Sequence, residues 1–355
     1  MTEPKEIKVI QKQQLTTWLE KLEDYIIYSP VKRDKYSEFA RITDISKIDL
    51  TIRNTYLPPK EIIFAQTKTL FKFDLREKVP KVAPEAIDPK ETDPKKQLIF
   101  GIRPCDAHAF AALDKTFDSE FKDPYYLTAR KNTVLVGLAC LQPDINCFCT
   151  SVGFDPFSGT ALDILMVDLG DSYLLKIYTE NGQQLLETDS GLFSTPTQEQ
   201  LNDSEARSAQ AMEKLTRKID TPGIPEKLGE VFEDDYWEKV VRKCLGCGIC
   251  TYLCPTCYCF DITDENRGAK GERVRTWDSC MYPEYTVHAS GYNPRPARMN
   301  RLRNRMYHKF KYYPDLYEIF GCVGCGRCIR HCPVNIDIID IMNGVKQIRT
   351  GGSSA

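Results

Sequence analysis

Long apolar runs are missing from this sequence of 355 residues. No stretch approaches the roughly 20 apolar residues that span a bilayer, and the longest candidate, Val134 to Leu141, suits a buried strand. The first ten residues, MTEPKEIKVI, are charged and polar and contain no signal-peptide core. We therefore expect a cytoplasmic protein that makes no use of a membrane.

Several signatures of catalysis and nucleotide binding are also absent. The sequence has no G-x-G-x-x-G and no G-x-x-x-x-G-K-[ST], which argues against a dinucleotide or P-loop nucleotide site on this chain. It has no H-E-x-x-H and no C-x-x-C-H, which argues against zinc hydrolysis and covalent haem. We find no sequence signal for a nucleotide cofactor of its own.

Cysteine, by contrast, is abundant, with 15 residues. In a reducing compartment these thiols do not pair as disulfides, so metal ligation is the first explanation for so many of them. The C-terminal part from Val240 onward, which holds most of the cysteines, has 17 Lys and Arg against 10 Asp and Glu, although the whole chain carries only −2. Positive charge beside anionic thiolate-ligated clusters favours their reduction. We prefer this interpretation to nucleic-acid binding, because no aromatic–basic RNA-binding pattern accompanies the charge.

The order of apolar segments predicts an N-terminal α/β domain. Strand-like runs at 97–101 and 132–138 flank a helix-like segment at 107–117, which is typical of a parallel strand–helix–strand unit. Alternating apolar residues at 163–169 and 172–178 indicate a hairpin. The sequence further predicts a helix at 12–28, a strand within 61–73, a surface loop at 78–96, helices at 198–219 and 230–242, and a linker at 221–225.

Composition then changes near residue 197, and we expect an α+β protein in which a helical ferredoxin-like domain with two four-iron clusters follows the α/β domain. The expected divisions are an α/β domain at 1–195 with a cysteine site, a helical linker segment at 196–243, a two-cluster domain at 244–345, and a disordered tail at 346–355.

Two cysteine motifs carry the strongest signal. Each has the spacing C-x2-C-x2-C-x3-C followed by proline, at Cys244–Pro255 and again at Cys322–Pro333. In such motifs three thiolates bind one 4Fe-4S cluster and the fourth binds the neighbouring cluster. The predicted ligand sets are a first cysteine set (Cys244, Cys247, Cys250 and Cys332) and a second cysteine set (Cys322, Cys325, Cys328 and Cys254). Zinc sites usually pair cysteines with a longer gap between the pairs, so we favour iron and sulfur.

A weaker group of four cysteines lies in the α/β half. Cys105 follows the strand at 97–101, Cys140 ends the strand at 132–138, and Cys147 and Cys149 come just after it. Parallel strands open on the same edge, where ligand sites form, so this third cysteine set could hold another cluster. Free cysteines are also common as small buried residues, and spacing alone leaves both interpretations open.

The chain resembles a known family over nearly its whole length, from about Leu15 to about Ile341. The segments GIRPCDAHAF, NCFCTSVGFDP, CLGCGICTYLCPTCYCFD, RTWDSC and CVGCGRCIRHCPVNI occur in the order typical of one family. This family comprises the iron–sulfur subunits of anaerobic sulfite reductases and the beta subunits of soluble archaeal sulfhydrogenases, which are NiFe hydrogenases.

This resemblance implies an electron relay between a separate flavin (FAD) subunit that reacts with NAD(P)H and a catalytic subunit, which is a NiFe hydrogenase or a sulfite reductase. It also favours a third cluster on the third cysteine set, because the family pattern contains these cysteines. Asp106, in the same motif, is then a candidate substitute ligand or a group that bonds to a ligand.

Several reactive residues remain outside these sets. Cys257, Cys259 and Cys280 are candidates for a thiol or disulfide site or for alternative ligands, but buried thiols that line the cluster cavity are the simpler interpretation. His331, beside Cys332, is a candidate to tune or bind a cluster, although a lone histidine is more often a packing residue. Seven basic residues between Arg295 and Lys311 either screen the clusters, dock an acidic partner or form a solvated helix face.

We therefore expect an iron–sulfur electron-transfer subunit of a cytoplasmic oxidoreductase complex, non-catalytic by itself and with no nucleic-acid or membrane partner. The alternatives are a stand-alone disulfide or sulfur reductase that acts at Cys257, Cys259 and Cys280, and a redox sensor. We favour the first function because clusters in series are chiefly useful for moving single electrons along a path.

Overall fold

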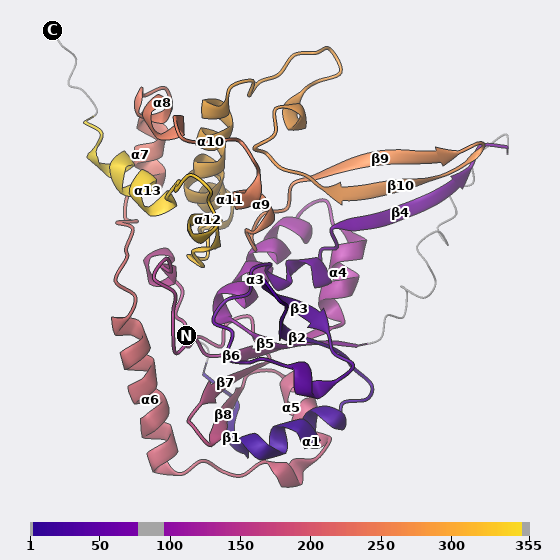
Figure 1. Cartoon of the computed structure of the whole chain (residues 1–355), viewed down its shortest axis with the longest axis vertical. Helices are drawn as coiled ribbons and strands as arrows, with labels where there is room; N and C mark the ends of the chain where they lie inside the picture. Colours follow the sequence, from indigo (N-terminus) through magenta and orange to yellow (C-terminus); the bar gives the residue numbers. More distant parts are fainter. Residues whose placement is uncertain (1–2, 77–95, 350–355) are drawn as a thin grey trace.

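The computed structural model describes residues 3–76 and 96–349. A seven-stranded sheet forms the base of the molecule in Figure 1, helices of the C-terminal third lie above it, and a narrow three-stranded sheet extends to one side. The large sheet has the strand order β1-β8-β7-β6-β5-β2-β3 and is built from β1 (Glu6–Gln11), β2 (Ile26–Lys32), β3 (Ser37–Arg41), β5 (Gln97–Ile102), β6 (Thr133–Leu138), β7 (Ile164–Asp168) and β8 (Ser172–Ile177).

The centre of the large sheet is parallel, as the sequence predicts. β5 pairs in parallel with β2 and β6, and β6 pairs in parallel with β7. Every residue of β6 is buried, because helices cover both faces of the sheet. β7 and β8 form the predicted antiparallel hairpin, so the strand and hairpin predictions for this region are confirmed.

Alternate residues of the central strands pack on opposite faces of the sheet. Leu98 and Val136 lie in one apolar cluster with Trp18 of α1 (Leu15–Glu20) and Leu185 of α5 (Glu180–Glu187). The other face packs Leu135 and its neighbours against α3 (Pro104–Phe117) and α4 (Pro124–Lys131). The result is a three-layer α/β/α arrangement, which Figure 1 shows edge-on.

The predicted helix at 12–28 is right over its first half and wrong over its second. A 3₁₀ turn occupies Lys12–Gln14, α1 ends at Glu20, and Ile26 begins β2. Trp18, Leu19 and Leu22 are buried as their helical spacing suggests, but the following IIYSPV segment is rich in β-branched residues and pairs with β5. The helix-like spacing of apolar residues thus extends in the sequence beyond α1 into residues that form β2.

Other boundaries also moved. β4 (Thr67–Asp74) starts well after Glu61, because Pro59–Ile62 forms a 3₁₀ turn with proline at its start. The predicted loop at 78–96 lies outside the described residues except for Lys96. α6 (Gln198–Glu213), which starts with a capping box at Thr197 and Gln200, ends before the predicted Ile219. Of the predicted helix at 230–242 only α8 (Tyr236–Val241) and the last residue of α7 (Ile224–Glu230) are helical, and α7 begins within the predicted linker at 221–225.

The cysteine motifs lie in loops and on two short helices, α9 (Ile249–Tyr252) and α12 (Arg327–Arg330). Three further helices follow or separate them in the chain, α10 (Arg298–Tyr307), α11 (Tyr313–Tyr317) and α13 (Ile338–Gln347). Their core contains Trp237, Leu302 and Phe310, and also Phe148 and Val152 from the α/β half. The two halves are thus packed together through side chains and not only joined by a linker.

The C-terminal part is not purely helical, which corrects the expected domain. β9 (Phe260–Arg267) and β10 (Lys270–Trp277) lie between the two motifs, and β10 pairs antiparallel with β4 from the N-terminal half. Figure 1 shows this sheet projecting from the body. The predicted tail at 346–355 overlaps α13, which includes Gln347, while residues 350–355 lie outside the described part. Among the described helices, none combines the length and apolar character needed to cross a membrane.

Candidate iron–sulfur centres

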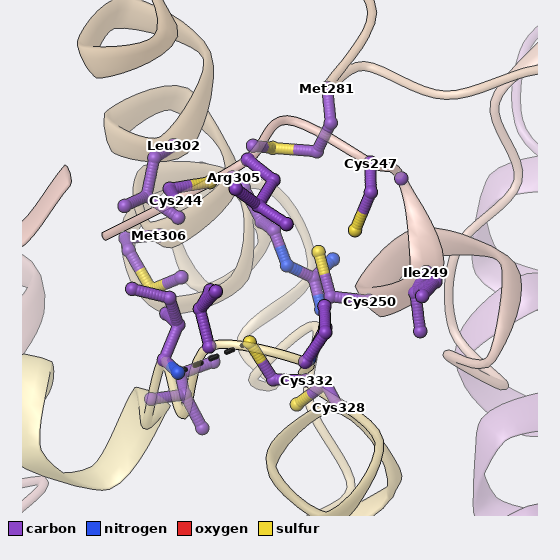
Figure 2. Close-up of a pocket in the computed structure, with 16 residues that line it drawn as sticks. Cys244, Cys247, Ile249, Cys250, Met281, Leu302, Arg305, Met306, Cys328 and Cys332 are labelled. Carbon is purple, nitrogen blue, oxygen red and sulfur yellow. Dashed lines mark hydrogen bonds between the residues drawn. The ribbon is translucent and has the colours of Figure 1, made fainter. Parts of the chain in front are cut away.

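The first cysteine set lines one pocket between the two motifs. Its four residues come from the loop before α9, from α9 itself and from the residue pair that follows α12, and Cys328 and Arg305 lie beside them. Figure 2 shows the sulfur atoms of this pocket arranged around a shared space. Four thiols that converge from two segments 82 positions apart (Cys250 to Cys332) fit the donor set of a 4Fe-4S cluster. Their role as ligands stays a prediction.

Glycines between the cysteines produce the tight turns of both motifs. Gly246 and Gly248 have φ of 71° and 75°, and Gly324 and Gly326 have φ of 64° and 73°, a region that residues with a Cβ seldom adopt. These turns direct amide groups at sulfur. The Gly246 N–H donates to Cys244 Sγ at 3.4 Å, and the N–H of Ile336 donates to Cys332 Sγ at 3.1 Å. Such donors stabilise thiolates and the clusters that they bind.

The second cysteine set lies deeper in the molecule. Cys254 and Cys322 are each only 8% exposed, and burial raises the pKa of Cys322 and Cys325 to about 12 and that of Cys328 to about 11. The neighbouring Cys254 contributes to all three shifts, so its thiol lies close to the other three. Free thiols at this site resist ionisation, and a bound metal centre would supply the positive charge that thiolate ligands require.

The third cysteine set also converges on one pocket, although its spacing left this open. Cys105 lies in the first turn of α3, Cys140 follows β6, and Cys147 and Cys149 line the same pocket, together with Gly324 and Cys325 of the second motif. This is the carboxyl edge of the parallel strands β5 and β6, where binding sites of such sheets lie. That these four thiols bind a third centre stays a prediction.

The loop that holds Cys147 and Cys149 packs directly on the second motif. The Phe148 N–H donates to the Gly324 carbonyl at 2.9 Å, and the Cys147 thiol donates to the Cys325 carbonyl at 3.7 Å. A Cβ on Gly324 would lie 2.4 Å from the Cys149 nitrogen. Only a glycine therefore permits this approach, and the two cysteine sites share a wall.

Asp106 and His331 do not point into the pockets that the cysteines line. Both carboxylate oxygens of Asp106 accept hydrogen bonds from Arg327, at 2.5 and 2.7 Å, in an ion pair that is 1% exposed on each side. Because the ion pair uses both carboxylate oxygens of Asp106, it argues against the interpretation of this residue as a cluster ligand. The ring of His331 packs edge-on against Tyr56, with centroids 4.4 Å apart. Burial and then the nearby Arg330 and Arg327 lower its pKa, as expected for a packing histidine.

None of the three remaining cysteines lines the pocket of the first or the third set, and their interpretation as buried thiols beside the clusters stays a prediction. Cys257 is buried and accepts a hydrogen bond from Arg305 Nη1 at 3.3 Å. Cys259 and Cys280 lie at the base of the β9–β10 hairpin, where the Asp278 N–H donates to the Cys259 carbonyl at 2.9 Å. Hydrogen bonds from the Cys280 thiol, the Cys280 amide and the Tyr285 hydroxyl lower the pKa of Cys259 to about 6 against the opposing effect of burial.

The basic run at 295–311 is largely inside the protein. Arg301, Arg303, Arg305 and Lys309 are between 2% and 7% exposed, so the interpretation as a solvated helix face is wrong for these four. Lys309 Nζ donates to Cys254 Sγ at 3.2 Å, which favours the charge-screening interpretation.

Lys60, from the N-terminal half, also lies beside the second cysteine set, because its Nζ donates to the carbonyls of Cys254 and Cys257 at 3.2 and 2.8 Å. No pattern in the sequence around Lys60 signals this role.

Taken together, the repeated motif, its glycine turns and the converging thiols define a 4Fe-4S protein of the ferredoxin type. The sequence profile of a 4Fe-4S dicluster domain matches residues 243–336. The chain is also 33% identical over 322 residues to sulfhydrogenase 2 subunit beta of Pyrococcus furiosus, which covers 90% of this chain and 92% of the relative. The chain therefore belongs to the iron–sulfur electron-transfer subunit family represented by that protein, and the resemblance recognised from its motifs is confirmed.

Proposed function

We propose that the chain is the electron-relay subunit of a multi-subunit oxidoreductase and that it holds three 4Fe-4S clusters, one on each cysteine set. It would pass electrons between a flavin subunit that reacts with NAD(P)H and a catalytic subunit of the NiFe hydrogenase or sulfite reductase type. The name of its relative supports the hydrogenase arrangement, since that protein is a sulfhydrogenase subunit.

The linear order of the three cysteine sets carries this proposal. Cys325 belongs to the second set and also lines the pocket of the third set. Cys328 belongs to the second set and also lines the pocket of the first. The second set therefore lies between the first set and the third set and is in contact with each of them. Three redox centres in contact along a line suit the transfer of single electrons from one end to the other.

One end of this line reaches the surface. Cys247, of the first set, is exposed, whereas the other fourteen cysteines are buried or half-buried. Leu245, two residues earlier, is 59% exposed and lines the same pocket. An exposed apolar side chain beside a redox centre is a suitable docking point for a partner. We propose that one partner subunit receives or delivers electrons at this end.

The third cluster is tested by Cys147→Ala in the purified native protein. If each cysteine set holds four irons, this change lowers iron content by about a third and interrupts transfer, while the two clusters of the C-terminal motifs remain. Iron content equal to that of the wild type would remove the third cluster from the proposal. Cys280→Ala, which alters a cysteine outside all three sets, is the matched control and keeps its iron.

The partners are tested by anaerobic affinity purification of the native chain, with identification of co-purifying chains and analysis of iron, nickel, flavin and sirohaem. A flavin subunit together with a nickel-containing or sirohaem-containing chain would support the relay and name the reaction. A chain that carries its clusters but no partner would contradict it.

A second candidate function rests on Cys259 and Cys280. Their direct interaction at the base of the β9–β10 hairpin fits a stand-alone reductase of disulfides or sulfur compounds better than it fits a redox sensor. Turnover of such a substrate by the purified single chain with a chemical reductant would favour this function. No turnover with intact clusters would exclude it.

A further inference from the structure

Three buried cations lie around the second cysteine set. Lys60, Arg305 and Lys309 are each only 2% to 3% exposed. Cysteines are the charges that most oppose the effect of burial on the pKa of each cation, and Glu61, next to Lys60 in the chain, also interacts with that lysine. Unpaired buried charges are costly, so this arrangement points to an anionic occupant of the same region.

Arg305 differs from the two lysines because it faces two sites. It projects from α10 and lines the pocket of the first cysteine set, where Figure 2 shows it directed toward Cys250. The thiolates that raise its pKa against the effect of burial include Cys250 of the first set and Cys254 and Cys328 of the second. Its guanidinium therefore lies between two groups of predicted ligands.

The hydrogen bonds of Arg305 are incomplete in the protein. Nη1 donates to Cys257 Sγ at 3.3 Å, but Nη2 is buried and has no hydrogen-bond partner among the described residues. Buried guanidinium donors are normally satisfied. A donor left free beside converging thiols is placed to bond to an inorganic sulfide or a ligand sulfur.

Lys309 provides the contrast. Its Nζ donates to Cys254 Sγ at 3.2 Å, to Thr256 Oγ1 at 3.0 Å and to the Gly321 carbonyl at 2.7 Å. Its cysteine neighbours, Cys254, Cys257 and Cys322, include members of the second set and none of the first. Lys309 thus lies beside cysteines of the second set and none of the first, whereas Arg305 lies beside cysteines of both sets.

We infer that Arg305 is the shared counter-ion of the two motif clusters, and that it stabilises the reduced state of both. The inference rests on the proposed relay. Each cluster gains negative charge on reduction, so a fixed positive charge in a poorly solvated site raises its potential. Because arginine stays protonated at all accessible pH values, this contribution does not depend on pH. Arg305 acts as a positioning residue and takes no part in a chemical step.

The test is a potentiometric titration of the native holoprotein, followed by electron paramagnetic resonance, for Arg305→Gln, Lys309→Met and Arg303→Gln. Arg305→Gln shifts the midpoint potentials of both motif clusters to more negative values, and Lys309→Met shifts only one. Arg303 is the matched control because it lies on the same helix and is 7% exposed. It donates instead to the Phe232 carbonyl and to Glu233, so Arg303→Gln leaves both potentials unchanged.

Two unchanged potentials in an Arg305→Gln protein that keeps its iron would overturn the inference. If that variant loses its iron, Arg305→Lys decides the matter. A lysine keeps a positive charge at this place, so both potentials stay close to the wild-type values, and a large fall in either potential would overturn the inference. Wild-type protein that contains no iron would instead contradict the proposed relay, so the two failures are distinguishable.

Discussion

At the scale of single residues, the chemistry of each cysteine depends on which groups reach its sulfur. Cys257, Cys259 and Cys280 are close in sequence or in space, yet their pKa values differ in direction. A hydrogen bond with a neighbouring thiol and then burial raise the pKa of Cys257 and Cys280, while donors to its sulfur lower that of Cys259. The pKa values of two buried lysines depend on their neighbours in the same way. Burial lowers the pKa of Lys60 to about 8, whereas the cysteines beside Lys309 raise its pKa despite burial. Residue type alone predicts none of these differences.

The altered acidity of Cys259 predicts selective alkylation of the anaerobic holoprotein. Because its pKa is lowered to about 6, Cys259 is mostly thiolate at neutral pH, and its alkylation by iodoacetamide falls as pH drops through 6. The Cys280 thiol has a raised pKa and reacts only at high pH. The rates are followed by mass spectrometry of peptides across a pH series.

Cys280→Ser is the control for this prediction. It replaces the thiol that lowers the pKa of Cys259 most, so the alkylation profile of Cys259 changes relative to the wild type. A Cys259 that reacts no faster at neutral pH than an ordinary thiol would contradict the assignment.

At the scale of elements, the sequence predicted the central strands well and the short helices poorly. β5 and β6 consist almost entirely of buried apolar residues, and such runs between turn signals are reliable indicators of parallel strands. β9, in contrast, is exposed over nearly its whole length. Its polar sequence gave no periodic signal, and its strand conformation depends on pairing with β10 and, through β10, with β4.

The contact between the cysteine loop and the second motif predicts that Gly324→Ala destabilises the protein by about 3 kcal/mol or more. The added Cβ would lie 2.4 Å from the Cys149 nitrogen, at a residue with φ of 64°. Relieving this contact requires the backbone at Gly324 and the backbone at Cys149 to move apart, which separates the second motif from the loop of the third cysteine set. Thermal unfolding of the anaerobic holoprotein measures the change.

Gly268→Ala is a matched control for this substitution. Gly268, in the β9–β10 turn, has the same φ of 64° but open space where the Cβ would be. It therefore reports the backbone strain by itself, about 1 kcal/mol. Equal losses in the two variants would show that the close approach contributes nothing.

At the scale of the whole molecule, the buried ion pair between Asp106 and Arg327 connects the two halves. Asp106 lies in α3 beside the third cysteine set, and Arg327 lies between Cys325 and Cys328 of the second. Arg327 Nε also donates to the Thr55 carbonyl at 2.8 Å. One guanidinium therefore ties the cysteine motif to two separate segments of the α/β half.

Asp106→Asn is expected to destabilise the protein by about 3–5 kcal/mol, because it leaves the buried charge of Arg327 without its partner. The double variant Asp106→Leu with Arg327→Met removes both charges and loses less stability than Asp106→Leu or Arg327→Met alone. Unfolding midpoints of these three holoproteins provide the comparison. A double variant whose loss equals the sum of the single losses would show that the two charges do not interact.

The amino-acid sequence by itself determined the kind of centre, and it predicts the residues that form it. The spacing of the two motifs, their glycines and the following prolines specify a four-iron ligand set through local geometry alone, and the apolar runs specify the parallel sheet. Only the tertiary structure decided that the third cysteine set forms one pocket, that it touches the second motif, and that Lys60, Arg305 and Lys309 face cysteines. These features join residues that lie far apart in the chain, and they depend on how buried surfaces pack, which local pattern does not specify.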